Sequence, residues 1–186
     1  MAKLISQLVV SLDGYYCGIN NKIDWHIIDD DYNSYAKKLL QDAQCLLMGR
    51  RTFKLMEQFW PTHEARTASP EIAKEMNRLP KFVLSQTLTN TNWPQTEIIA
   101  TPIVKTVEQL KQQHEDAILL LGSGQLVRLL TQHQLIDEYQ LMITPVLIGG
   151  GKSAFRDMAT TVSLNLIEAK AFASGNVLLR YQANKK

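Results

Sequence analysis

An unbroken apolar run that ends in a glycine turn is the feature that most constrains this chain. Residues 117–121 read Ala-Ile-Leu-Leu-Leu, and the turn Gly122-Ser123-Gly124 follows directly, before leucines at helical spacing. An apolar run without polar alternation is typical of a strand that is buried on both faces of a parallel sheet. The sequence therefore predicts a buried strand that passes straight into a helix.

The glycine turn allows two interpretations. The first N–H groups of a helix have no partner within the helix, so a turn at that point can receive a phosphate group. Alternatively, the glycines only shape the turn and Ser123 caps the helix. The dinucleotide-binding fingerprint is incomplete, because Val127 stands at its third glycine position and no carboxylate follows at the usual distance. An ordinary NAD site of that kind is disfavoured.

Composition favours one domain over residues 1–186. The 186 residues are 45% hydrophobic, which is enough for one continuous core. The net charge is only +2 and the basic residues are scattered, so the sequence shows no patch for nucleic acid. The apolar run after Met1 is too short for a signal peptide or a membrane span, and Lys185-Lys186 is expected to be a solvated tail. We expect a soluble cytoplasmic protein.

Cysteine and histidine spacing gives no sign of a metal site. Cys17 and Cys45 do not form a C-x-x-C pair, and the four histidines are isolated from one another. We expect both cysteines to be reduced structural residues and no catalytic metal to be bound.

Predicted strands and helices alternate through the first three quarters of the chain. This order is typical of an α/β fold with a mostly parallel sheet and helices on both faces. Two strand-like runs meet at the turn 173–176, which predicts a C-terminal antiparallel hairpin. Strands are expected at about 4–10, 44–48, 81–85, 97–100, 117–121, 138–148, 163–172 and 176–182, and helices at 30–41, after Gly49, at 106–114 and from Ser123. Residues 58–80 are expected to be a surface excursion with a short helix.

A second junction between a strand and a helix carries two arginines. The apolar strand 45–48 is followed by Gly49-Arg50-Arg51-Thr52. A guanidinium group offers a planar fork of donors that suits phosphate oxygens, and Thr52 adds a hydroxyl. The alternative is that both arginines are simply solvated.

A third apolar strand ends at Ser85-Gln86. Ligands of open α/β sheets bind outside the carboxyl ends of the strands. Three such ends with groups that suit phosphate predict one extended dinucleotide across them. The arginine pair would suit the additional 2′-phosphate of NADPH.

Several aspartates are candidates for proton transfer. Asp13 ends the first strand, although Asp13-Gly14 is also an ordinary turn dipeptide. Three aspartates, 29–31, start the first helix, where some of them must act as caps. One of the three could instead face a cleft, where partial burial would raise its pKa. The stretch Gly149–Ser153 resembles part of a phosphate-binding loop, but Val146 replaces the required first glycine, so we expect a flexible turn.

The order of these motifs resembles the dihydrofolate reductase superfamily, and most closely its riboflavin-biosynthesis pyrimidine reductase (RibD C-terminal) branch. The resemblance spans about Lys3 to Tyr181 and rests on the motifs 11–14, 48–53, 121–124, 135–138 and 144–152. It implies a mixed eight-stranded sheet of the dihydrofolate reductase type, NADPH as hydride donor and a homodimer. The zinc deaminase signature of bifunctional riboflavin enzymes is absent, and so is the family's D-x-P after Gly49.

The resemblance also implies roles for individual residues. The substrate would lie against Asp13, Trp25, Asp30, Phe53 and Thr144, with Asp30 or Asp13 as the proton donor. The cofactor would lie against Gly49, Arg50, Arg51, Thr52, Ser85, Gln86, Leu121, Gly122, Ser123, Gly124, Gln125 and Leu126.

The leading hypothesis is an NADPH-dependent reductase of a small heterocyclic substrate, similar to 5-amino-6-(5-phosphoribosylamino)uracil reductase. Dihydrofolate or pteridine reduction is the enzymatic alternative. A regulatory protein that binds NADPH without turnover is a further alternative, and a purely structural oligomer is another.

Overall fold

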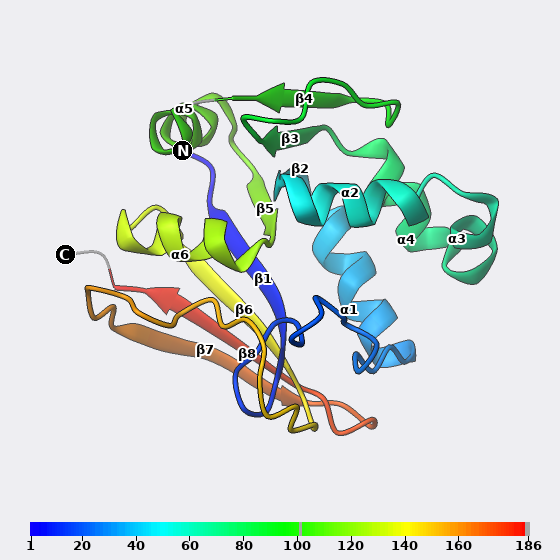
Figure 1. Cartoon of the computed structure of the whole chain (residues 1–186), viewed down its shortest axis with the longest axis vertical. Coiled ribbons are helices and arrows are strands. Elements are labelled where there is room, and N and C mark those ends of the chain that lie inside the picture. Colours follow the sequence, from blue (N-terminus) through cyan, green and yellow to red (C-terminus); the bar gives the residue numbers. More distant parts are fainter. Residues whose placement is uncertain (101, 185–186) are drawn as a thin grey trace.

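The computed structural model describes residues 1–100 and 102–184, so Lys185 and Lys186 lie outside the described residues. Its centre is one eight-stranded sheet with the strand order β4-β3-β2-β5-β1-β6-β8-β7 (Figure 1). The strands are β1 (Leu4–Ser11), β2 (Ala43–Gly49), β3 (Lys81–Leu84), β4 (Thr96–Ile99), β5 (Ala117–Leu121), β6 (Glu138–Thr144), β7 (Leu164–Ala171) and β8 (Val177–Ala183). The helices are α1 (Asp30–Gln41), α2 (Arg50–Phe59), α3 (His63–Ala68), α4 (Pro70–Arg78), α5 (Ile103–Gln113) and α6 (Gly124–Gln132).

Strand pairing confirms the predicted mixed sheet. Neighbouring strands from β4 to β6 pair in parallel, and β8 is antiparallel to both β6 and β7. The carboxyl ends of β1 to β6 therefore lie on one rim of the sheet. Because β8 runs the opposite way, its first residue lies on the same rim, next to the end of β6. We call this edge the carboxyl rim.

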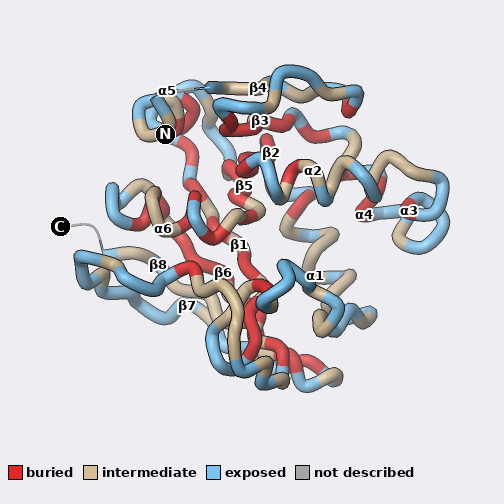
Figure 2. The backbone as a smooth tube through the Cα atoms, in the orientation of Figure 1, coloured by how far each residue is buried: buried red, intermediate tan, exposed pale blue. Residues whose placement is uncertain are grey.

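Helices cover both faces of the sheet, as expected. Leu110 of α5 and Leu130 of α6 pack in one core cluster with Leu4 and Leu120. Leu40 of α1 packs in another cluster on the opposite face, with side chains of α2 and α4. Figure 2 shows buried residues along the central strands and exposed residues along β7, which ends the sheet.

Two element predictions were wrong in part. Residues 58–80 are more ordered than expected, because α2 continues to Phe59 and α4 packs against the core through Ile72 and Met76. Their spacing of four residues is a short helical stripe that the surrounding prolines obscure. Strand β6 ends at Thr144 instead of residue 148, where Pro145 removes a backbone donor.

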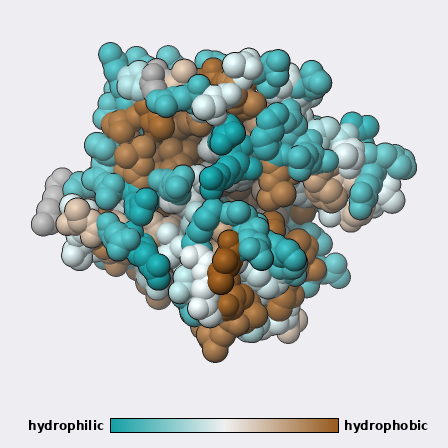
Figure 3. All heavy atoms as spheres, in the orientation of Figure 1, coloured by the Kyte–Doolittle hydropathy of each residue, from teal (hydrophilic) through white to brown (hydrophobic). Residues whose placement is uncertain are grey.

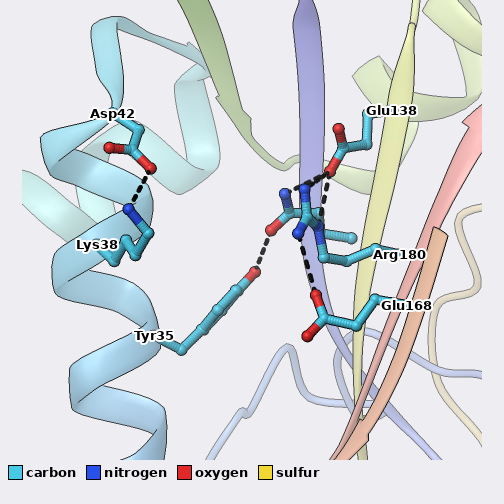
Figure 4. Close-up of polar contacts among 7 residues, drawn as sticks. Tyr35, Lys38, Asp42, Glu138, Glu168 and Arg180 are labelled. Atoms are coloured by element: carbon cyan, nitrogen blue, oxygen red, sulfur yellow. Dashed lines mark hydrogen bonds and ion pairs between the residues drawn. The ribbon is translucent and has the colours of Figure 1, made fainter.

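A buried polar layer joins α1 to the last strands (Figure 4). Tyr35 Oη donates to Gln140 Oε1 at 2.8 Å, and Gln140 Nε2 donates to Glu138 Oε1 at 2.7 Å. Arg180 Nε donates to Glu138 Oε1 at 2.9 Å and Arg180 Nη1 to Glu168 Oε2 at 3.0 Å. These contacts fix α1 against the β6 and β8 side of the sheet.

Cys17 and Cys45 are both free and buried, which confirms their prediction as reduced residues. Within residues 1–100 and 102–184 no helix combines the length and apolar character needed to cross a membrane. Over the same residues no three histidine, cysteine or acidic side chains gather in a way that could hold a metal ion.

Candidate functional site

The two predicted junctions between a strand and a helix, at residues 122–124 and 49–52, meet on the carboxyl rim. Gly49 N–H donates to the Gly122 carbonyl oxygen at 3.4 Å. A Cβ atom added at Gly49 would lie 3.0 Å from Ser123 Oγ, and one added at Gly122 would lie 3.2 Å from Thr52 Oγ1. Gly122 also has a φ of +63°, a conformation that favours glycine. Glycine at both positions therefore lets the ends of β2 and β5 approach each other closely.

The helices that begin at these junctions have no side-chain caps. Ser123 is the N-cap residue of α6, as the alternative interpretation of the glycine turn has it, but its hydroxyl makes no capping hydrogen bond. Gly49 is the N-cap residue of α2 and has no side chain to offer. Two helix N-termini, each with a positive dipole end, thus lie on adjacent strands without a side-chain acceptor.

Positively charged side chains surround these N-termini. Arg50 and Arg51 are exposed, and neither guanidinium makes an ion pair or hydrogen bond with another part of the described chain. Arg128 of α6 adds a third charge, and its Nη1 donates to the Arg156 carbonyl at 3.3 Å. The charges of Arg51 and Arg128 both act on the Tyr16 hydroxyl. Sequence reasoning missed Arg128, although its place four residues after Gly124 puts it on the same helix face.

The Tyr16 ring covers the start of α6. A Cβ atom at Gly124 would lie 2.1 Å from Tyr16 Cε1, so the ring packs directly on the glycine. Burial raises the pKa of the Tyr16 hydroxyl. No local sequence pattern indicates this contact, because Tyr16 lies more than 100 residues from α6 and the fold alone brings them together.

The remaining predicted cofactor residues differ in what they can reach. Ser85 Oγ accepts hydrogen bonds from Thr87 N–H at 3.2 Å and Leu88 N–H at 2.9 Å, so its hydroxyl forms a local turn. Gln86 and Gln125 are exposed on the carboxyl rim. The Leu126 side chain is only 6% exposed and belongs to the core, so only its backbone in the first turn of α6 is placed to meet a cofactor. The half-buried Leu121 packs against the core of the opposite face.

Asp13 acts as an acceptor on the carboxyl rim. Its carboxylate accepts from Ser11 Oγ at 2.6 Å, from Gly149 N–H at 2.8 Å and from Ile148 N–H at 3.3 Å. The Ser11 hydroxyl and these two backbone groups lower the pKa of Asp13. An ionised carboxylate can only accept hydrogen bonds, so in this state Asp13 holds the 148–149 turn, and its role as a proton donor stays a prediction. Its contact with Gly149 confirms that the glycine stretch forms a turn.

The three aspartates at the start of α1 have separate roles. Asp29 is the N-cap residue and accepts from Tyr32 N–H at 2.7 Å. Asp31 Oδ2 accepts from Ala173 N–H at 3.2 Å, which joins α1 to the β7–β8 turn. Asp29 is half-buried, whereas Asp30, which the resemblance places beside the substrate, is exposed. Among these three, Asp30 is the carboxylate without a hydrogen bond to another described residue.

The predicted aromatic residue Trp25 lies just before α1. Its ring meets His26 edge to face, with 4.4 Å between the ring centroids. Trp25 Nε1 and His26 Nε2 are both buried without a hydrogen-bond partner. Burial lowers the pKa of His26 to about 4, so the imidazole is neutral at pH 7.

Phe53 and Thr144 were both expected on the substrate side. Phe53 is 0% exposed and packs against Trp93, with 5.6 Å between the ring centroids, so the prediction of substrate contact is wrong. The residue points into the core because α2 turns this side toward the sheet. Thr144 ends β6 on the carboxyl rim, is also 0% exposed, and its Oγ1 has no hydrogen-bond partner.

Two surface hollows lie away from the carboxyl rim. One of about 460 Å³ is lined by residues at the ends of β7 and β8, and one of about 330 Å³ is lined by residues of α2 and the loop before β4. Neither contains a predicted site residue. In contrast, Figure 3 shows a hydrophobic area between α5 and α6, on the side of the sheet where α6 begins. Ile99 and Ile103 are half-buried and pack against the core cluster that contains Leu110 of α5 and Leu130 of α6.

The eight-stranded mixed sheet, with its antiparallel C-terminal hairpin and helices on both faces, has the dihydrofolate reductase-like fold. The sequence profile of the RibD C-terminal domain matches residues 2–178, and the chain belongs to that family. A dihydrofolate reductase is among the solved structures that share the fold.

Individual proteins agree with this assignment. The uncharacterized protein YyaP of Bacillus subtilis (strain 168) is 31% identical over 182 residues, which cover 98% of this chain and 95% of that protein. A crystal structure from Shewanella sp. PV-4, whose name refers to riboflavin biosynthesis, is 22% identical with a TM-score of 0.76 and covers 98% of this chain and 99% of its own. Dihydrofolate reductase from Enterococcus faecalis, complexed with NADP(H) and RAB-propyl, is 13% identical with a TM-score of 0.67 and covers 98% of this chain and 97% of its own. The last two likenesses show the fold.

Proposed function

We propose that this protein is an NADPH-dependent reductase that delivers a hydride to a C=N or C=O carbon of a small heterocyclic substrate. One observation carries the proposal. Two uncapped helix N-termini and two arginines without partners lie at the ends of adjacent strands, where open α/β sheets bind their ligands.

The donor set fits a phosphorylated dinucleotide. The N-termini of α2 and α6 would hold the diphosphate, helped by the hydroxyl groups of Thr52 and Ser123. Arg50 and Arg51 would hold the 2′-phosphate, since a guanidinium group binds phosphate through two parallel hydrogen bonds. The Tyr16 ring covers Gly124, so it has to turn before a phosphate can approach that part of α6.

The apolar area between α5 and α6 supports the same placement. An adenine ring is flat and mostly apolar at its faces, so burying it against such a surface makes the free energy of binding more favourable. Gln86 is exposed at the end of β3, two strands from the Gly122 turn, and can offer an amide to the ring. This end of the rim would therefore hold the adenosine part.

The protein's own residues would place the substrate and supply a proton. NADPH, when bound, supplies the two electrons as a hydride. Trp25 would form an aromatic wall, and Asp13 would keep the 148–149 turn in place through its two backbone contacts. Asp30 is exposed near the other end of the rim, where β1, β6 and β8 meet. We propose that it relays a proton from water to the substrate nitrogen or oxygen.

A pyrimidine similar to 5-amino-6-(5-phosphoribosylamino)uracil is the first candidate substrate class, and a dihydropteridine is the second. We also propose a cytoplasmic location and a homodimer. Light scattering of the purified protein would measure its molar mass and so test the homodimer. A regulatory protein that binds NADPH without turnover is the rival proposal. Substrate-dependent loss of NADPH absorbance would exclude it.

The test compares Arg50→Ala and Arg51→Ala with the unchanged protein in titrations with NADPH and NADH. A charge-assisted hydrogen bond contributes about 1.5–3 kcal/mol, so losing the 2′-phosphate contact should weaken NADPH binding about 10- to 100-fold. NADH lacks that phosphate, and its affinity should change little.

Arg66→Ala provides the control, because Arg66 is an exposed arginine on α3. It should leave both affinities unchanged. Equal NADPH and NADH affinities for the unchanged protein, or no NADPH binding at all, would refute the proposed cofactor.

A further inference from the structure

Three polar residues form a row where β1, β6 and β8 meet the carboxyl rim. Ser11 pairs with Thr144 in the parallel register, and Ile143 pairs with Val177, which places Thr144 beside Asn176. The three residues are 1%, 0% and 0% exposed, in that order. Alternation along the strands puts their side chains on the face that α1 covers, together with Met142.

Two oxygens of this row have no hydrogen-bond partner. The Ser11 hydroxyl is used, because it donates to Asp13 and accepts from Tyr15 N–H. In contrast, Thr144 Oγ1 and Asn176 Oδ1 are buried without a partner. Buried polar atoms are nearly always hydrogen-bonded in folded proteins, so a pair of unpartnered oxygens side by side points to a ligand.

The segment before α1 and the first turn of α1 cover these oxygens. Asn176 Nδ2 donates to the Ile27 carbonyl at 2.9 Å, and Ala173 N–H donates to Asp31 Oδ2, in the first turn of α1, at 3.2 Å. A hydrogen bond with Ser174 also lowers the pKa of Asp29. These polar contacts join residues 27–31 to the turn between β7 and β8, while Tyr32 and Tyr35 of α1 pack against the core beside Met142. A ligand therefore reaches the row only when residues 27–31 move away from that turn.

The segments that border the row are rich in aspartate, and the nearest lysines, which include Lys22, Lys152 and Lys170, lie just outside them. Residues 11–15, 23–36, 144–150 and 171–176 contain no lysine or arginine. They contain five aspartates, which are Asp13, Asp24, Asp29, Asp30 and Asp31. The opposite holds at the ends of β2 and β5, where Arg50, Arg51 and Arg128 gather. A phosphate group is attracted to the arginine end and repelled from the aspartate end.

We infer that the substrate of the proposed reductase is a heterocycle without a phosphate group, whose N–H and C=O edge binds Asn176 Oδ1 and Thr144 Oγ1. The inference rests on the proposed function and narrows its substrate class. Asn176 Oδ1 can only accept, so it requires a ring N–H or an amino group. Thr144 can donate its hydroxyl proton to a carbonyl oxygen or a ring nitrogen.

The experiment uses a matched pair of ligands, 5-amino-6-(5-phosphoribosylamino)uracil and the same compound without its phosphate. Calorimetry measures binding of each to the full chain, both alone and saturated with NADPH. The compound without phosphate should bind at least about 10-fold more tightly, and the ratio should shrink at high salt because ions screen the aspartates. Asp30→Asn should lower the ratio of the two affinities, unphosphorylated over phosphorylated, about 2- to 5-fold at low salt.

Two substitutions test the row itself. Thr144→Val keeps the shape of the side chain but removes the hydroxyl. It should lower the affinity for the unphosphorylated compound about 5- to 10-fold. Asn176→Asp keeps an acceptor oxygen, so it should lower this affinity less than Asn176→Ala does. Thr67→Val, at an exposed position of α3, is the control and should change nothing.

The outcomes separate this inference from the proposed cofactor. Tighter or equal binding of the phosphorylated compound, or no binding of either compound, overturns the inference, whatever NADPH does. Failure to bind NADPH overturns the proposed function, while the phosphate preference measured on the chain alone still decides the inference.

Discussion

His26 shows how one buried residue can make stability depend on pH. Its imidazole has an unpartnered Nε2, and burial lowers its pKa to about 4 from an ordinary value of 6.5. Between these values the unfolded chain binds a proton that the folded chain does not. The free energy of unfolding therefore falls as the pH falls from 6.5 toward 4.

We predict that His26 accounts for a loss of about 2 kcal/mol of stability between pH 7 and pH 5. Urea unfolding at the two pH values measures the loss. His26→Gln cannot gain a proton in this range, so its loss should be smaller by about the same amount. His133→Gln is the matched control, because His133 is exposed at the end of α6. An unchanged pH dependence in His26→Gln would contradict the assignment.

At the scale of elements, the start of α6 is shaped by a contact from the opposite end of the chain. Gly124 lies in the first turn of α6, where alanine would ordinarily favour the helix. The Tyr16 ring occupies the space that a Cβ atom would need, 2.1 Å from its Cε1 atom. Glycine is therefore required at this position by packing and not by the backbone conformation.

We predict that Gly124→Ala costs about 1–3 kcal/mol of stability, which is the usual cost of overpacking. In the background of Tyr16→Ala the same change should be neutral or slightly stabilising, because the clash is gone. Denaturant unfolding of the two single variants and the double variant forms the cycle. Additive effects would show that the cost of Gly124→Ala does not come from the Tyr16 ring.

At the scale of the whole molecule, the sheet separates two kinds of chemistry along one rim. The strand order places the arginine end at β2 and β5, and places Ser11, Thr144 and Asn176 at β1, β6 and β8. A ligand across the rim touches elements from both halves of the chain. Its binding should therefore stabilise the whole fold and not a single loop.

We predict that NADPH at about 100 times its dissociation constant stabilises the protein by about 2.7 kcal/mol. For a domain of this size that corresponds to a rise in Tm of roughly 5–11 °C. Differential scanning calorimetry measures the rise, and NADH at the same concentration should give a smaller one. An identical rise with both cofactors would contradict a role for the 2′-phosphate.

The sequence predicted the fold better than the site, for a physical reason. Apolar runs such as 117–121 and turns such as Gly122–Gly124 are local signals, and the strands and hairpin they predicted are present. The roles of Asp13, Asp30 and Phe53 were carried over from a resemblance, whereas their burial and hydrogen bonding depend on the tertiary structure. Tyr16, Arg128 and Asn176 were missed, although only Arg128 left a signal in its spacing from Gly124.

The sequence by itself determined the order and type of the main elements, because hydrophobic periodicity and turn residues act over a few neighbouring positions. It also determined that glycines and arginines follow the ends of particular strands. Only the tertiary structure decided which of those ends become neighbours, which carboxylates are exposed or bonded, and which oxygens are buried without a partner. These properties depend on strand order and on contacts between residues more than 100 positions apart, and no local pattern encodes them.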